Sequence, residues 1–291
     1  MKLNKPTPFA KGPVEIRRAL DLIERAVMGF DRITVWTDHP APDIPVHLIK
    51  QHCRDVTVRN CNSQKFHPLW QTEIYVHQPT RQALVELQSA LGAGRRTSIQ
   101  YAEVAIDWIT RDCVAAGFFY DFVLEHLRVP YMRQPVRFEE GTAYFARLAA
   151  RNGKKVGTNV VMYADEPSKL GAPALVDQPC CHLEYRFHGI ETLAQHGLLS
   201  LSDCVDFDHH TFWLENLRLY VLAKKVELGR RLAPDGTLVS DVALTKRANT
   251  LLDRYRCGDV VVLQDLWCEQ PLIAKLVTRI DNSPFIRGVT L

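Results

Sequence analysis

The sequence predicts an α+β fold in which helices flank a mainly antiparallel sheet and the C-terminal part is helical. Strand-like alternation of apolar and polar residues dominates the middle of the chain, as in "YAEVAIDWIT". Helical periodicity dominates both ends. With 291 residues, of which 46% are hydrophobic and 24% charged, the chain is large enough to bury a full core.

The elements of the first half are predicted in order from these patterns. A helix near 14–28 precedes a strand in "RITVWTD", and a second helix is expected near 45–53. Strands near 55–60 and 71–77 come next, followed by a helix over "TRQALVELQSAL". The strand "YAEVAIDWIT" and a helix near 113–127 complete this half.

The second half begins with strands and ends with helices. Strands are predicted near 131–139, 142–148, 156–164 and 180–188. From residue 189 the periodicity is mostly helical, in "IETLAQHG", "HHTFWLENLRLYVLAKKVEL", "DVALTKRANTLLDRY" and "LQDLW". We therefore expect an α+β core over 1–190 and a mainly helical part over 191–291 that packs on it.

Composition narrows the class of protein. The eight cysteines form no CxxC pair, which argues against a zinc site and a disulfide framework and favours reduced thiols. The N-terminus has no apolar signal region, and no apolar run approaches the ~18 residues of a membrane span. These features predict a soluble cytoplasmic protein that has no membrane partner.

Basic residues gather in three places, although the net charge is only +3. The clusters are "GRR" at 94–96, "RLAARNGKK" at 147–155 and "AKKVELGRR" at 223–231. Guanidinium and ammonium groups bind phosphates, so the second cluster, which contains Arg147, Arg151, Lys154 and Lys155, is a candidate phosphate-binding site. The alternative is that each cluster is a solvated surface turn.

Two predicted strands alternate so regularly that their polar faces can be assigned. Side chains of alternate strand residues share a face. The first strand then has a polar face of Tyr101, Glu103, Ala105 and Asp107. The second has a polar face of His182, Glu184, Arg186 and His188.

The acids on these faces predict a site for Mg²⁺ or Mn²⁺, because buried carboxylates need a cation or a partner. Glu103 and Asp107 are about 13 Å apart along a strand, so both cannot bind one ion directly. One would be a ligand together with Glu184, and the other would position a base or pair with an arginine. The alternative is that all three acids face solvent on an open sheet.

A tyrosine ends the strand in "NVVMYADEPSK" and is followed by two acids and a turn. Asn159, Val161 and Tyr163 share one side of this strand. If that side adjoins the acidic faces, the phenol of Tyr163 lies among carboxylates. In "DFDHHTFW", by contrast, Asp208 is expected to cap a helix and to leave His209 and His210 on the surface.

Four motifs in this order resemble the Rep_trans replication-initiation proteins of rolling-circle plasmids and of related phages and mobile elements. They are "YAEVAIDW", "GTAYFARLAARNGKK", "NVVMYADEPSK" and "CHLEYRF". That family has two acids four residues apart on one strand, a G-T-x-Y strand, a strand that ends in a nucleophilic tyrosine, and an R-x-E strand. The resemblance covers about a third of the chain, from 101 to 189.

The resemblance implies a function and a role for each matching residue. Tyr163 would attack DNA at a replication origin and form a 5′-phosphotyrosine link, with Mg²⁺ or Mn²⁺ held by the acidic site. The protein would act with a host helicase and polymerase, and as a homodimer in some relatives. The metal ligands would be Glu103, Asp107 and Glu184. Arg186 and the second basic cluster would contact DNA, and Tyr144, His182 and Lys169 would support the site.

The chain departs from the family pattern at several positions. Tyr101 stands where the family has arginine, Glu103 replaces aspartate, and Ala146 and Arg147 replace glycine and serine. Asp165 replaces the lysine expected two residues after the tyrosine, so Lys169, Arg186 or a metal would have to favour the phenolate. The alternative function is a non-catalytic DNA-binding or regulatory protein that retains the fold.

Overall fold

One antiparallel sheet of nine strands forms the centre of the protein. The computed structural model describes residues 14–61, 69–92, 94–127, 129, 137–146, 149–151, 154–170, 177–217, 220–224, 240, 242–243, 246 and 260–267. The order along the sheet is β2, β3, β1, β4, β9, β8, β6 and β5, and β7 pairs with β8 alone. The bounds are β1 (Ile23–Thr37), β2 (Asp55–Asn60), β3 (Thr72–His77), β4 (Thr97–Thr110), β5 (Arg137–Glu139), β6 (Thr142–Ala146), β7 (Ala149–Arg151), β8 (Lys154–Tyr163) and β9 (Cys180–His188).

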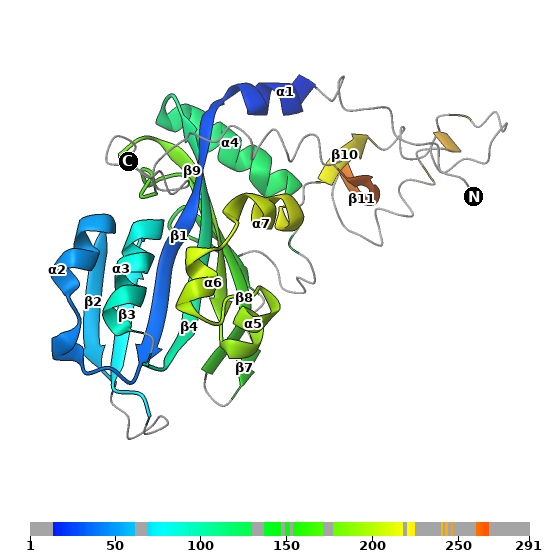
Figure 1. Ribbon diagram of the computed structural model, residues 1–291. Coiled ribbons are helices and arrows are strands. Elements are labelled where there is room, and N and C mark those ends of the chain that lie inside the picture. Colours follow the sequence, from blue (N-terminus) through cyan, green and yellow to red (C-terminus); the bar gives the residue numbers. More distant parts are fainter. Residues whose placement is uncertain are drawn as a thin grey trace.

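Helices pack on one face of this sheet (Figure 1). Their bounds are α1 (Val14–Asp21), α2 (Val46–Ile49), α3 (Arg81–Leu91), α4 (Cys113–His126), α5 (Ile190–Gln195), α6 (Leu201–Val205) and α7 (His209–Asn216), with short 3₁₀ turns at Ala41–Asp43 and Lys50–His52. The predicted α+β class is therefore confirmed, with the sheet antiparallel throughout the strands described.

The main core lies between the sheet and these helices. The Trp108 ring of β4 packs edge-on against Phe119 of α4, with 5.2 Å between the ring centroids. On the same side, Trp213 of α7 contacts Tyr185 of β9 and donates a hydrogen bond from Nε1 to the Ala105 carbonyl at 3.3 Å. Trp108 and Trp213 are fully buried. The apolar sides of β4 and β9 thus face the helices, and their polar sides face away from them.

The predicted helix over 14–28 is wrong in its second half. The helix α1 ends at Asp21, and β1 begins at Ile23. The reason is that this part of β1 is buried on both faces: Ala26 and Met28 belong to the main core, while Val27 packs on the other face with Ile109 and Leu170. An apolar run of this kind lacks the alternation that identifies a strand.

The C-terminal part is helical only at its start. Helices α5, α6 and α7 pack against β1, β4, β8 and β9 of the sheet. The expected helices over 220–224 and 263–267 are wrong, because these residues belong to β10 (Tyr220–Lys224) and β11 (Val260–Trp267), which pair antiparallel. Both segments are rich in β-branched and aromatic residues, which favour strands. Most of "DVALTKRANTLLDRY" lies outside the described residues, and a boundary at 190 stays a prediction.

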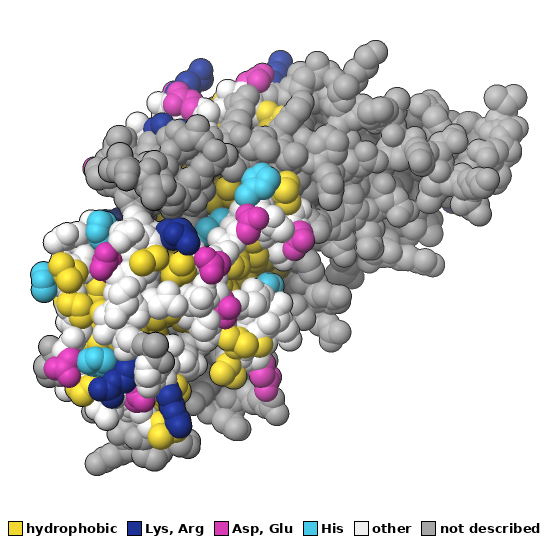
Figure 2. Space-filling view, in the orientation of Figure 1, with side chains coloured by type: hydrophobic (Ala, Val, Ile, Leu, Met, Phe, Trp, Pro, Cys, Tyr) yellow, Lys and Arg dark blue, Asp and Glu magenta, His cyan; other side chains and the backbone are white. Residues whose placement is uncertain are grey.

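The surface on the helix side carries a mixture of charges (Figure 2). In that view the basic side chains are scattered among acidic and hydrophobic ones instead of forming one patch. Across the described residues, no helix is both long and apolar enough to span a lipid bilayer.

Candidate metal centre and tyrosine site

The pairing of β4 with β9 brings the two predicted polar faces together. Glu103 lies opposite Arg186, Ala105 opposite Glu184, and Asp107 opposite His182. Residues directly opposite each other on paired strands project to the same side of a sheet. The acids of both strands therefore share the face that the helices leave uncovered.

A third acid, Asp31, reaches this face because β1 contains a β-bulge. Phe30 pairs with Val104 and Arg32 with Glu103, so Asp31 is an extra residue between two registered pairs. A bulge interrupts the alternation of a strand and re-aims a side chain. Gln78, at a φ of 42°, holds Asp31 through a backbone hydrogen bond of 2.8 Å to its carbonyl and through a side-chain bond to Oδ1. The sequence analysis misses Asp31, because it begins the strand one residue later, at Arg32.

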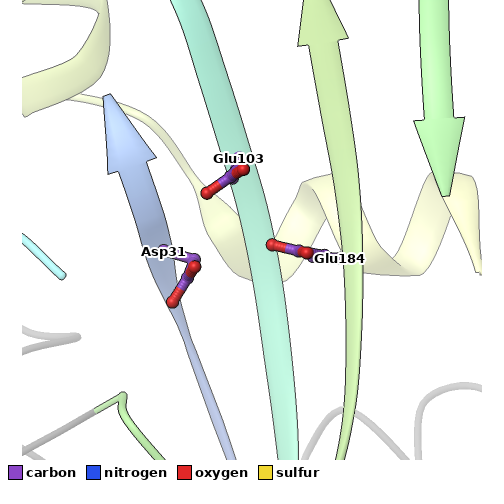
Figure 3. Close-up of side chains that lie close together, drawn as sticks. All are labelled: Asp31, Glu103 and Glu184. Carbon is purple, nitrogen blue, oxygen red and sulfur yellow. The ribbon is translucent and has the colours of Figure 1, made fainter. Parts of the chain in front are cut away.

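Three carboxylates from three neighbouring strands form one cluster. One oxygen each of Asp31, Glu103 and Glu184 lies within 4.8 Å of the others, and all three side chains project to one side (Figure 3). Glu184 is 1% exposed, and its Oε2 has no hydrogen-bond partner among the described residues. An all-oxygen donor set with a buried oxygen that accepts no hydrogen bond fits a hard divalent cation such as Mg²⁺ or Mn²⁺. We call these residues the acidic trio.

Two arginines offset part of the charge of the acidic trio. Arg32 Nη2 lies 2.8 Å from Oε1 of Glu103. Arg186 donates from Nε to Glu184 Oε1 at 2.7 Å and lies 3.4 Å from Glu103. The phenol of Tyr101 also donates to Glu103. Arg186, expected at DNA, therefore sits between the two glutamates.

Asp107 belongs to a different contact group. Its carboxylate lies 2.5 Å from Nδ1 of His182, accepts a 2.5 Å bond from the Ser168 hydroxyl, and is fully buried. His182 Nε2 is 3.6 Å from Glu184 Oε2, which is beyond hydrogen-bond distance. Burial lowers the pKa of a histidine, but Asp107 and Glu184 outweigh it and hold the pKa of His182 well above its usual value. Of the two acids on β4, the structure brings Glu103 and not Asp107 to Glu184.

Tyr163 lies next to this pair on the same face. It is opposite His182 in the register of β8 with β9, and the two rings stack with centroids 4.5 Å apart. Burial, together with Asp31, Asp107 and Glu184, raises the pKa of the Tyr163 phenol. The ammonium of Lys169 lies 5.7 Å from the ring centroid and is ion-paired with Glu166. The tyrosine of the G-T-x-Y motif, Tyr144, is opposite Val161 one strand further out.

Two other sequence expectations can be placed in the structure. In the second basic cluster, Arg151 and Lys154 pair at the end of the hairpin formed by β7 and β8, with Lys155 next to them, whereas Arg147 lies outside the described residues. Asp208 caps α7 as predicted, accepting from Thr211 N at 3.0 Å. The prediction that His209 lies on the surface is wrong, because its ring packs 4.6 Å from that of Phe30 and burial lowers its pKa to about 3.

Cation binding to the acidic trio is expected to strengthen as pH rises. Burial, assisted by Glu184 and Asp31, raises the pKa of Glu103 to about 8, against the pull of Arg32. A folded-state pKa above the ordinary value means that Glu103 stabilises the metal-free fold at low pH and that this contribution is lost as pH rises toward 8. A cation must displace the same proton, so its affinity should increase about tenfold between pH 7 and pH 9.

Titration calorimetry with Mn²⁺ in two buffers of different ionisation heat measures both the affinity and the proton release. Glu103→Gln provides the control, since it should remove the pH dependence together with most of the affinity. An affinity that is the same at pH 7 and pH 9 would contradict the expectation.

No family model and no curated protein matches this chain. The arrangement of its side chains is therefore the basis for assigning a function.

Proposed function

We propose that this protein is a replication-initiation protein that nicks and rejoins one DNA strand through Tyr163, with help from Mg²⁺ or Mn²⁺, as in rolling-circle replication. The observation that carries the proposal is the position of Tyr163. It stands on the sheet face opposite the helices, next to His182, which lies between Asp107 and the acidic trio. The order of the four Rep_trans-like motifs supports the same function.

The acidic trio would hold the cation through Asp31, Glu103 and Glu184. A bound Mg²⁺ or Mn²⁺ supplies charge that polarises a phosphodiester and stabilises its developing negative charge. Arg32 and Arg186 are ion-paired with the two glutamates of the trio. Once a cation neutralises those glutamates, both guanidinium groups would be available to bind phosphate oxygens.

Tyr163 would carry out the covalent step. Its Oη forms a bond to phosphorus while the bond from phosphorus to the 3′ oxygen breaks. The phenol loses a proton and the departing 3′ oxygen gains one, which leaves a 5′-phosphotyrosine and a 3′-hydroxyl that a host polymerase can extend. Lys169, whose ammonium lies 5.7 Å from the Tyr163 ring centroid, would have to leave Glu166 to favour the phenolate in place of the lysine that the Rep_trans pattern has at position 165. Reversal of the step rejoins the strand.

A covalent-adduct assay tests the proposal. Single-stranded and supercoiled DNA from the region that flanks the coding sequence of this protein would be incubated with it and Mn²⁺. The expected result is a DNA–protein adduct that survives denaturation and maps by mass spectrometry to Tyr163. Absence of an adduct with Mg²⁺ and with Mn²⁺ would reject cleavage.

A second candidate is a DNA-binding or regulatory protein without catalysis. The observation that favours it is the pairing of both glutamates with arginines, Glu103 with Arg32 and Glu184 with Arg186. It predicts DNA binding without an adduct and without a response to metal.

A homodimer and a host helicase are further partners that the family resemblance suggests.

The second basic cluster is expected to contact phosphates. Changing Arg151, Lys154 and Lys155 to Gln should weaken DNA binding and reduce the slope of log affinity against log salt by about one unit for each phosphate contact that the substitutions remove. Fluorescence anisotropy over a salt series measures the slope. Replacing Arg95 and Arg96, which lie in the first basic cluster, is the matched comparison. An unchanged slope would assign the hairpin to ordinary surface.

A further inference from the structure

A row of aromatic side chains crosses the same sheet face, opposite the helices. Thr34 pairs with Tyr75 of β3 on one side and with Tyr101 of β4 on the other, and Tyr101 pairs with His188 of β9. These side chains therefore project to one side. Trp36, two residues along β1 from Thr34, projects to this side as well. We call Trp36, Tyr75, Tyr101 and His188 the aromatic stripe.

Guanidinium groups lie over two rings of the stripe. Arg32 Cζ lies 4.6 Å from the centroid of Tyr101, and Arg59 Cζ lies 5.1 Å from that of Tyr75. The His188 ring lies 4.6 Å from Tyr101. The stripe thus combines flat rings with planar cations that can bind phosphate.

The stripe is not explained by core packing. Both hydrophobic clusters of the described residues exclude all four of its members, and each member is partly exposed. Neighbouring side chains at the buried positions Ile33, Val35 and Ile74 point the opposite way, into the main core beneath the helices. Partly exposed aromatic rings with adjacent cations indicate a binding surface.

We propose that the aromatic stripe binds single-stranded DNA by stacking on its bases and leads that strand to the acidic trio. Unpaired bases expose the faces that stack on tyrosine and tryptophan, whereas a duplex hides them. From β3 to β9 the stripe crosses three strand spacings of about 4.8 Å, which is enough for two or three nucleotides. Arg59, over the Tyr75 ring, supplies positive charge beside the stripe, whereas Arg32 is held by Glu103.

The stripe is continuous with the acidic trio. Tyr101 and Arg32, which contact each other, both donate to Glu103. A strand held on the stripe is therefore placed one row of same-face residues from the acidic trio, whereas Tyr163, opposite His182, lies six residues along β9 from His188. The claim that the stripe leads DNA to a cleavage site rests on the proposed function. Binding of DNA by the stripe can be measured separately from cleavage by Tyr163.

The test measures binding without catalysis. Full-length protein carrying Tyr163→Phe is titrated into a labelled single-stranded 12-mer in EDTA, and anisotropy reports the affinity. Trp36→Leu and Tyr75→Leu should each weaken binding about tenfold, because each removes one stacking ring. Tyr75→Phe, which keeps the ring, should stay within about twofold of the parent. Phe118→Leu is a matched control on an exposed α4 residue, at 63% exposure, and should change nothing.

Circular dichroism melting of every variant confirms that it is folded before its affinity is compared. Equal affinity for a blunt duplex of the same sequence would overturn the proposal, as would unchanged binding by both leucine variants. If wild-type protein forms no adduct but the leucine variants lose binding, DNA binding by the stripe is supported and the cleavage function is rejected. If an adduct forms and the leucine variants bind normally, the cleavage function is supported and DNA binding by the stripe is rejected.

Discussion

Replacing Tyr163 with Phe is expected to abolish DNA cleavage and the covalent adduct while the fold is preserved. The substitution removes the one oxygen that would attack phosphorus and keeps the ring that stacks on His182 at 4.5 Å. Loss of a nucleophile costs at least ~1000-fold in rate, whereas loss of a half-buried hydroxyl costs little stability. Quantified adduct formation and nicking of supercoiled DNA measure the first effect, and thermal melting measures the second.

Tyr144→Phe is the matched control for this experiment. Tyr144 lies on β6, opposite Val161, and β8 separates it from Glu184 and His182 on β9. We expect this variant to retain most of the nicking activity. An adduct that persists in Tyr163→Phe and maps to Tyr144 or Tyr101 would show that another tyrosine is the nucleophile.

The strands of the site could be predicted because their alternation is regular. In β4 and β9, every second residue is apolar and faces the helices, so the side that carries Glu103, Glu184 and His182 follows from the sequence. Sequence alone could not supply the register. The pairing of Ala105 with Glu184 places Glu103 and Asp107 at equal diagonal offsets from Glu184. Side-chain contacts decide between them, because Arg186 bridges Glu103 and Glu184 whereas Asp107 is bound to His182.

The acid on β1 could not be predicted from periodicity. A regular strand would send Asp31 and Arg32 to opposite faces, yet the bulge brings Asp31 to Glu103 and Glu184 on the same face where Arg32 pairs with Glu103. The support of Asp31 by Gln78 also depends on contact between residues 47 positions apart. A charged pair, "DR", just before a strongly apolar strand was the available signal, and it also fits an ordinary turn.

The second large effect is expected from Asp31→Asn, which should prevent metal binding by the acidic trio. Asparagine keeps the oxygen that accepts from Gln78, so the metal-free protein should melt near the wild-type temperature. It removes one of three charged ligands, so stabilisation by Mn²⁺ should largely vanish. In the wild type, a cation at 100 times its dissociation constant should add about 2.7 kcal/mol to the free energy of unfolding.

Asp107→Asn should show the reverse pattern and thereby decide which acids bind the metal. It removes the charge that faces His182 inside the protein, where breaking a buried ion pair costs roughly 3–5 kcal/mol. The acidic trio remains complete, so the added stability in Mn²⁺ should persist even though the starting melting temperature is lower. Melting curves of wild type and both variants, with EDTA and with Mn²⁺, separate the two effects. If Asp107→Asn instead loses the Mn²⁺ response while Asp31→Asn keeps it, the metal lies between Asp107 and Glu184, and the trio is held together by Arg32 and Arg186 alone.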